Sequence, residues 1–138
     1  MKTKIYFAAI FFFLCITVFP VMAQQSDTVS PPSWIEGTWT YTESLYVGDE
    51  GPEGVFSISF TASDIIFDEG SLNGFISSGE VTMFTQKAEL SSYETYIEYF
   101  DGYWYREKFE KTAAGTAVMR SVYETSEGES GECIYTRQ

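Results

Sequence analysis

A two-residue alternation of side chains, first visible in residues 34–46, constrains the fold of this chain more than any other feature. After Gly37, the sequence places Trp39 and Tyr41 at alternate positions with threonines between them. Because successive side chains of a β-strand point to opposite faces, this pattern predicts a strand with one apolar face. Gly37 allows the backbone to bend or to approach a neighbour closely, and Trp39 brings a large apolar side chain to the inner face. We therefore expect a small β domain that closes over Trp39.

The same alternation recurs along the chain, and we find no convincing helical period. The clearest case is residues 55–61, where Phe56, Ile58 and Phe60 alternate with polar residues. Further strands are expected at residues 64–67, 75–77, 80–87, 93–111, 117–125 and 132–138, with turns at Gly70, Asn73 and Gly74. The prediction is an all-β fold: an up-and-down antiparallel meander of about eight strands that closes into a barrel. A sandwich of two sheets is the alternative.

Residues 93–111 are the most distinctive segment, because eight of the seventeen residues between Tyr93 and Phe109 are aromatic. The Asp-Gly pair at 101–102 predicts a hairpin with a two-residue turn. The predicted register pairs Phe100 with Tyr103, Glu98 with Tyr105 and Tyr96 with Glu107 on one face, and Tyr99 with Trp104 on the other. A strand that covers a core on one side needs only one apolar face. The surplus of aromatic residues indicates a lined cavity or an exposed binding patch.

The first 23 residues have the pattern of a secretory signal. Lys2 and Lys4 precede an apolar run over residues 5–18, and Ala23 ends the segment with a small side chain. We expect cleavage after Ala23, a secreted or periplasmic protein, and no stable membrane insertion after cleavage. Lipidation at Cys15 stays open, although bulky residues precede it. Residues 24–33 are expected to be a flexible lead-in, and residues 34–138 a single barrel domain.

The charge and composition exclude several classes of function. The chain has a formal net charge of −12, and cleavage of the signal leaves six basic residues against twenty acidic ones. This balance argues against binding to nucleic acid or to anionic membranes. The chain has no histidine, the commonest general base and metal ligand, so we expect no metal and no cofactor. The acidic loop at residues 47–54 lacks the spacing of an EF-hand.

Cleavage of the signal also leaves Cys133 as the single cysteine. An intramolecular disulfide is then impossible, so packing alone must hold the fold together. Cys133 falls in the last predicted strand, where we expect it to be a small buried residue rather than a reactive thiol.

The Gly37-Thr38-Trp39 motif resembles the Gly-x-Trp signature on the first strand of lipocalins and related calycin barrels. The short secreted meander and the terminal Tyr135-Thr136-Arg137 look like small bacterial lipocalin-like domains. The resemblance implies a barrel in which Trp39 packs beneath a basic side chain from near the last strand, and Arg137 is the positional candidate. It also implies that the barrel binds a small hydrophobic ligand.

We expect the ligand site inside the barrel, on the aromatic face of the hairpin. The candidate ligand-binding residues are Tyr96, Phe100, Tyr103, Tyr105 and Phe109, with Arg120 or Arg106 to hold a ligand carboxylate. One alternative is an interaction module in which Tyr99 and Trp104, together with Arg106, face outward and meet a partner protein or a glycan. Another is a hydrolase that uses Glu98 and Glu107 as a carboxylate pair, since the chain has no histidine to activate a serine.

Overall fold

The computed structural model of the chain describes residues 27–44, 57–113 and 115–138. The expected signal peptide and the acidic loop at 47–54 lie outside these residues. One antiparallel sheet, in the order β4-β3-β2-β1-β9-β8-β7-β6-β5, contains all of the described strands. Its elements are β1 (Gly37–Ser44), β2 (Ser57–Phe60), β3 (Ile65–Phe67), β4 (Gly70–Ser71), α1 (Leu72–Ser78), β5 (Val81–Ala88), β6 (Ser92–Tyr99), β7 (Trp104–Thr112), β8 (Gly115–Thr125) and β9 (Ser130–Arg137).

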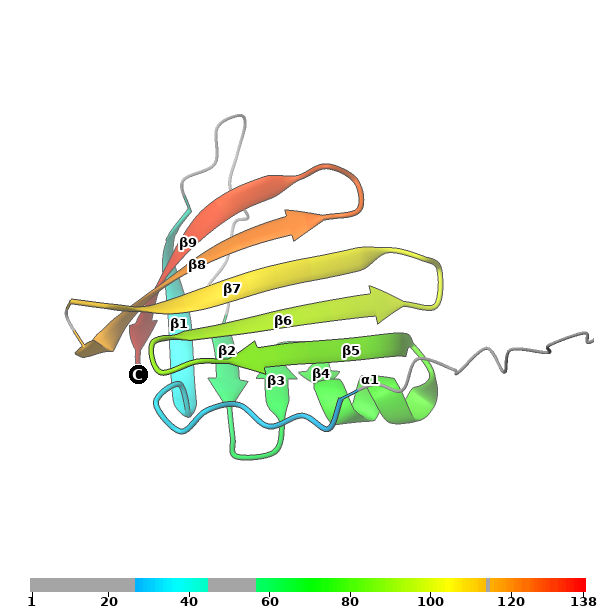
Figure 1. Ribbon diagram of the computed structural model, residues 1–138, viewed down its shortest axis with the longest axis horizontal. Helices are drawn as coiled ribbons and strands as arrows, with labels where there is room; N and C mark the ends of the chain where they lie inside the picture. The colour runs from blue at the N-terminus through cyan, green and yellow to red at the C-terminus, as the bar shows by residue number, and fades with distance from the viewer. Residues whose placement is uncertain (1–26, 45–56, 114) are drawn as a thin grey trace, which may run out of the picture.

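The sheet is an up-and-down meander that curls into a half-barrel, so the predicted all-β fold class is confirmed (Figure 1). Each strand pairs with its neighbour in sequence except at one place, between β4 and β5, and β9 returns to pair with β1. Within the described residues, β4 and β5 are therefore the two edges of the sheet. The helix α1 packs against both of them and against β3.

The helix α1 replaces the turn and the short strand that the sequence predicts at residues 73–77. The Ser71 hydroxyl accepts a hydrogen bond from the backbone N–H of Gly74 at 3.0 Å, which caps the first turn. Gly79 ends the helix in the left-handed conformation, with φ at 81°. A seven-residue helix makes about two turns, so its apolar period is too short to recognise in the sequence.

Residues 27–36 form part of the fold, which corrects the expected flexible lead-in from Asp27 onward. The backbone N–H of Asp27 donates to the carbonyl of Phe84 at 2.7 Å, and the Asp27 carboxylate accepts from the N–H of Gln86 at 2.8 Å. Val29 and Ile35 are buried in the core. The segment thus runs beside the edge strand β5 before it reaches β1, as the blue trace in Figure 1 shows.

Trp39 joins the two ends of the meander. Its ring is 1% exposed, and its Nε1–H donates to the carbonyl of Ile35 at 2.7 Å. Trp39 pairs with Arg137 across β1 and β9, and the Arg137 guanidinium carbon lies 4.4 Å from the centroid of the indole. Arg137 also donates to the carbonyls of Glu36 and Trp34. The cation thus covers the ring and satisfies backbone acceptors of the segment before β1.

The hairpin of β6 and β7 has a register one residue away from the predicted one. Ile97 pairs with Tyr105 and Glu98 with Trp104. Phe100, Asp101 and Gly102 all lie in the loop, because Gly102 takes the left-handed conformation with φ at 85° and its N–H donates to the carbonyl of Tyr99. This is the geometry of a three-residue hairpin loop. The prediction of a two-residue turn is therefore wrong.

We expect Gly37→Ala to weaken the junction between β1 and β9. Gly37 has a φ of 123°, and a Cβ atom there would lie 2.7 Å from Nη1 of Arg137. Strained backbone and displacement of Arg137 should together lower the free energy of unfolding by about 3 kcal/mol. Chemical denaturation measures this loss. The matched control is Gly128→Ala, since Gly128 also has a positive φ but has nothing within 4 Å of its Cβ position. Equal losses at the two glycines would contradict the role assigned to Arg137.

Candidate functional site

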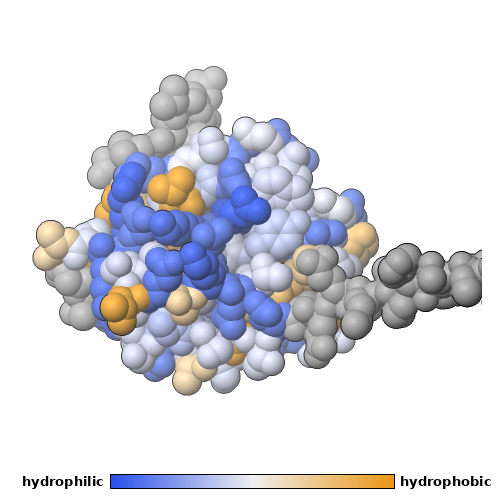
Figure 2. All heavy atoms as spheres, viewed as in Figure 1, coloured by the Kyte–Doolittle hydropathy of each residue, from blue (hydrophilic) through white to orange (hydrophobic). Residues whose placement is uncertain are grey.

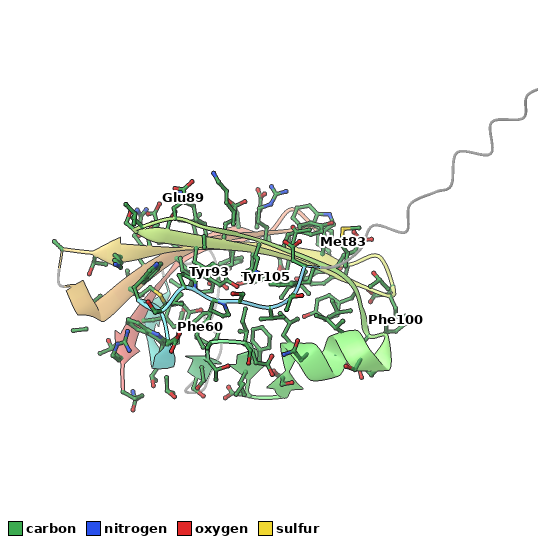
Figure 3. The ribbon with its side chains drawn as sticks, turned by 60° about the horizontal axis from the view of Figure 1, so that its bottom comes forward. Phe60, Met83, Glu89, Tyr93, Phe100 and Tyr105 are labelled. Carbon is green, nitrogen blue, oxygen red and sulfur yellow. The ribbon has the colours of Figure 1, made fainter. Side chains whose placement is uncertain are left out.

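The interior of the half-barrel is packed at one end and hollow at the other. Toward the Trp39 end, Phe60 lies against Tyr93 and Phe109, with ring centroids 6.2 Å and 5.2 Å away. Figure 3 shows Phe60, Tyr93 and Tyr105 pointing into the space that the curled sheet encloses. Beyond Tyr93 and Phe109, toward the β6–β7 loop, the inward side chains line a cavity of about 760 Å³.

Tyrosine is the commonest residue type in the wall of the cavity. The six tyrosines among the described lining residues form three neighbouring pairs, contributed by β1, β6, β7, β8, β9 and the β6–β7 loop. Their ring centroids are 5.9 Å apart for Tyr41–Tyr135, 6.0 Å for Tyr99–Tyr103 and 5.8 Å for Tyr105–Tyr123. The remaining lining residues are Ser57, Ile58, Phe67, Asp68, Glu69, Phe75, Glu80, Ile97, Glu107, Thr125, Glu129 and Cys133. The wall therefore combines aromatic surface with phenol hydroxyls and carboxylates.

Glu107 lies where the packed core meets the cavity, and we call this place the floor of the cavity. Its side chain is 4% exposed. The Tyr105 hydroxyl donates to Oε2 of Glu107 at 2.8 Å, while the hydroxyls of Ser121 and Tyr135 donate to Oε1. The three donors come from β7, β8 and β9, so the carboxyl group connects three neighbouring strands.

Burial sets the protonation of this group. Loss of solvent raises the pKa of Glu107 above that of an ordinary carboxyl, although its three hydroxyl donors work in the opposite direction. Burial also raises the pKa of Tyr105 and of Tyr135, and the neighbouring Glu107 adds to both shifts. Both phenols therefore stay protonated and remain hydrogen-bond donors at neutral pH.

Cys133 is buried beside this network and lines the cavity, as the sequence predicts for its burial. Burial raises the pKa of its thiol to about 11, with Glu107 contributing in the same direction. The thiol is protonated at neutral pH, and a protonated thiol is a poor nucleophile.

Arg106 of the hairpin and Arg120 of β8 face away from the cavity. Arg106 forms an ion pair with Glu124 at 2.6 Å, and Arg120 forms one with Glu132 on the outer face of β9. Figure 2 shows hydrophilic residues in a band over the outer face of the sheet. The expectation that Arg120 or Arg106 lines the barrel is therefore wrong. Alternation along β7 and β8 places both on the opposite side from Glu107 and Ser121.

The structure brings only part of the predicted ligand site together. Tyr103 and Tyr105 line the cavity, and Phe109 is buried in the packed end. Tyr96 lies on the outer face, and Phe100 is 72% exposed in the hairpin loop, so their predicted inward orientation is wrong. The physical reason is the register of the hairpin, since a shift by one residue moves every side chain of a strand to the other face.

Sequence reasoning missed four of the lining tyrosines: Tyr41, Tyr99, Tyr123 and Tyr135. A usable signal existed for Tyr123, because the alternation of residues 117–125 places it on the same side as Met119, which is fully buried. Tyr41 follows Trp39 by two residues and has the same inward direction. The predicted register places Tyr99 on the outer face, and this register is wrong by one residue.

The structure also contradicts the two alternative sites that the sequence predicts, the carboxylate pair and the outward aromatic pair. Glu98 lies on the outer face, where it accepts a hydrogen bond from the Tyr96 hydroxyl at 2.9 Å, and Glu107 lies inside. The two carboxylates are thus on opposite faces of the sheet and cannot act together on one substrate. The predicted outward pair of Tyr99 and Trp104 is wrong as well, because Tyr99 lines the cavity.

Trp104 packs instead against Tyr96 on the outer face, with ring centroids 5.9 Å apart. The Arg106 guanidinium lies 5.7 Å and 5.8 Å from the two ring centroids. Cation–π contacts and the ion pair of Arg106 explain this cluster as a stabilising element of the sheet.

Within residues 27–44, 57–113 and 115–138, no group of three or more Cys, Asp or Glu side chains is arranged to hold a metal ion. In the same part of the chain, we find no helix with the length and apolar character needed to cross a membrane. Comparisons of the chain with family models, with curated proteins and with solved structures found no match. The cavity is therefore the feature of the molecule that indicates a function.

We expect Glu107→Gln to change the pH dependence of stability. A carboxyl whose pKa is raised by folding stabilises the protein fully below the unfolded pKa, near 4.5, and this contribution is lost as the pH rises through the folded pKa. The variant does not titrate there. Its free energy of unfolding minus that of the unchanged protein should increase above pH 4.5, by about 1.4 kcal/mol for each unit of pKa shift.

Urea denaturation at a series of pH values from 4 to 9 measures this difference. The matched control is Glu98→Gln, which makes the same chemical change on the outer face of the adjacent strand. A difference that stays constant with pH for Glu107→Gln would show that burial does not govern this carboxyl.

Proposed function

We propose that the protein binds a small, mainly hydrophobic or aromatic molecule in the cavity of the half-barrel, as a secreted or periplasmic lipocalin-like protein. The observation that carries the proposal is the cavity of about 760 Å³, which remains although the other end of the same sheet is filled by side chains. Small-molecule sites typically have volumes of about 300–1,000 Å³ and mostly apolar walls with a few convergent polar groups.

The composition of the wall supports binding rather than simple packing. Tyrosine rings offer apolar contact area, and their hydroxyls can orient a bound molecule by hydrogen bonds. Thr125, Cys133 and the phenols of Tyr99 and Tyr103 also line the cavity and add polar atoms to its wall. Aliphatic side chains that filled this space would stabilise the fold more than a cavity does, because a cavity lowers the free energy of unfolding.

The resemblance to lipocalins is consistent with the position of the cavity. The motif residues Gly37 and Trp39 lie at the packed end, beneath Arg137, and the hollow end lies beyond them. This arrangement supports a ligand entering from the end opposite Trp39. An interaction module on the outer face is less well supported, because Tyr96, Trp104 and Arg106 already satisfy one another.

Titration with Nile red, a neutral apolar fluorophore, tests the proposal. We expect saturable enhancement of its fluorescence, and we expect Tyr105→Ala to weaken the affinity about tenfold, equivalent to ~1.4 kcal/mol, because a ring and a hydroxyl leave the wall. The control is Phe100→Ala, which removes an exposed aromatic ring from the loop of the same hairpin and should change the affinity less than about twofold.

Circular dichroism and thermal unfolding establish that both variants are folded. If the unchanged protein gave no saturable signal, or if Phe100→Ala weakened binding as much as Tyr105→Ala, the cavity would not be the binding site.

A further inference from the structure

We propose that the ligand carries a protonated amine, and that the Glu107 carboxylate binds this amine at the floor of the cavity. The inference rests on the proposed function and specifies the chemical class of the ligand. It follows from three features of the cavity: the sign of its charges, the environment of Glu107, and the pairing of its tyrosines.

The charged groups among the described lining residues of the cavity all have the same sign. Five acidic residues line it, and none of its described lining residues is a lysine or an arginine. Four of these five lining acids are solvent-exposed: Asp68, Glu69, Glu80 and Glu129. A cleft lined by one sign of charge concentrates counter-ions of the other sign and speeds their entry. The cavity therefore attracts cations and repels carboxylates such as fatty acids.

Glu107 is the one acid of the set that is buried. Its three described hydrogen-bond donors are the neutral hydroxyls of Tyr105, Ser121 and Tyr135. A carboxylate offers about four acceptor positions, so one remains for a ligand. A buried charge without a counter-charge is costly, and an ammonium group at this place would supply both the missing hydrogen bond and the compensating charge.

The tyrosine rings near Glu107 also favour a cation. The face of an aromatic ring carries partial negative charge and attracts a cation, most strongly where water is excluded. Two of the pairs contain a tyrosine whose hydroxyl donates to Glu107. These are Tyr105 in the pair Tyr105–Tyr123 and Tyr135 in the pair Tyr41–Tyr135. An ammonium group bound by Glu107 would therefore lie among rings that favour the same charge. The apolar part of the ligand would lie toward Ile58, Ile97 and Phe75.

Isothermal titration calorimetry at pH 7 with three matched compounds tests the proposal. The compounds are 4-phenylbutylamine, 4-phenylbutan-1-ol and 4-phenylbutyrate, which share one apolar part and differ in the charge of the head group. We expect the amine to bind at least about tenfold more tightly than the alcohol, and the acid to bind more weakly than the alcohol.

Glu107→Gln assigns the effect to one carboxyl. We expect this variant to bind the amine and the alcohol with nearly equal affinity. The matched control is Glu98→Gln, which removes one negative charge from the outer face of the adjacent strand and should leave the preference intact.

The outcomes separate the two proposals. Equal binding of amine and alcohol by the unchanged protein would overturn the amine inference and leave the apolar site standing. No binding of any of the three compounds would overturn both. If Glu107→Gln still bound the amine more tightly than the alcohol, the selectivity would come from the exposed lining acids, and the role of Glu107 would be overturned.

A measurement on the unchanged protein covers the case in which Glu107→Gln does not fold. The carbon-13 resonance of the Glu107 carboxyl should move when the amine is added and stay in place when the alcohol is added. A Glu107 carboxyl resonance whose chemical shift did not change when the amine was added would contradict the proposed contact.

Discussion

The contact between Arg137 and Trp39 is the interaction on which the shape of this protein depends. A β-sheet twists by itself, but its first and last strands here are far apart in sequence and need a specific contact to hold them together. Here β1 and β9 pair, and the Arg137 guanidinium covers the indole while it binds two carbonyls of the segment before β1. The lack of a side chain at Gly37 leaves the room that this guanidinium occupies. One cation thus connects the beginning of the fold to its end.

Alternation in the sequence predicts the longer strands and the all-β class, because a side-chain period of two is the direct consequence of strand geometry. It was not enough for α1, which is too short to show a helical period, or for the hairpin register. The register depended on whether Gly102 alone, in the left-handed conformation, would lengthen the loop by one residue. No local pattern distinguishes a two-residue turn from a three-residue loop reliably, since an Asp-Gly pair occurs in both.

That single residue of register decides which side chains form the site. It moves Tyr96 and Phe100 outward and brings Ile97 and Tyr99 inward. It also separates Glu98 from Glu107, so that one carboxyl is solvated on the outer face and the other is held by hydroxyls inside. The sequence contains the tyrosines and the acids, but the boundary between a filled and a hollow end is set by how side chains from seven strands meet. Such a boundary is a property of packing rather than of any one segment.

The segment beside β5 has a consequence for how copies of this chain behave together. An edge strand of eight residues presents unpaired backbone groups to which another chain can add, and such edges seed fibrils and insoluble aggregates. Asp27 occupies the Phe84 carbonyl and the Gln86 N–H, and the Gln86 side chain binds the backbone of Thr28 and Ser30. Residues 27–30 therefore cover the edge of β5 and protect the protein against aggregation. A chain that began at Trp34 would leave this edge exposed, so that β5 could pair with the β5 strand of another copy.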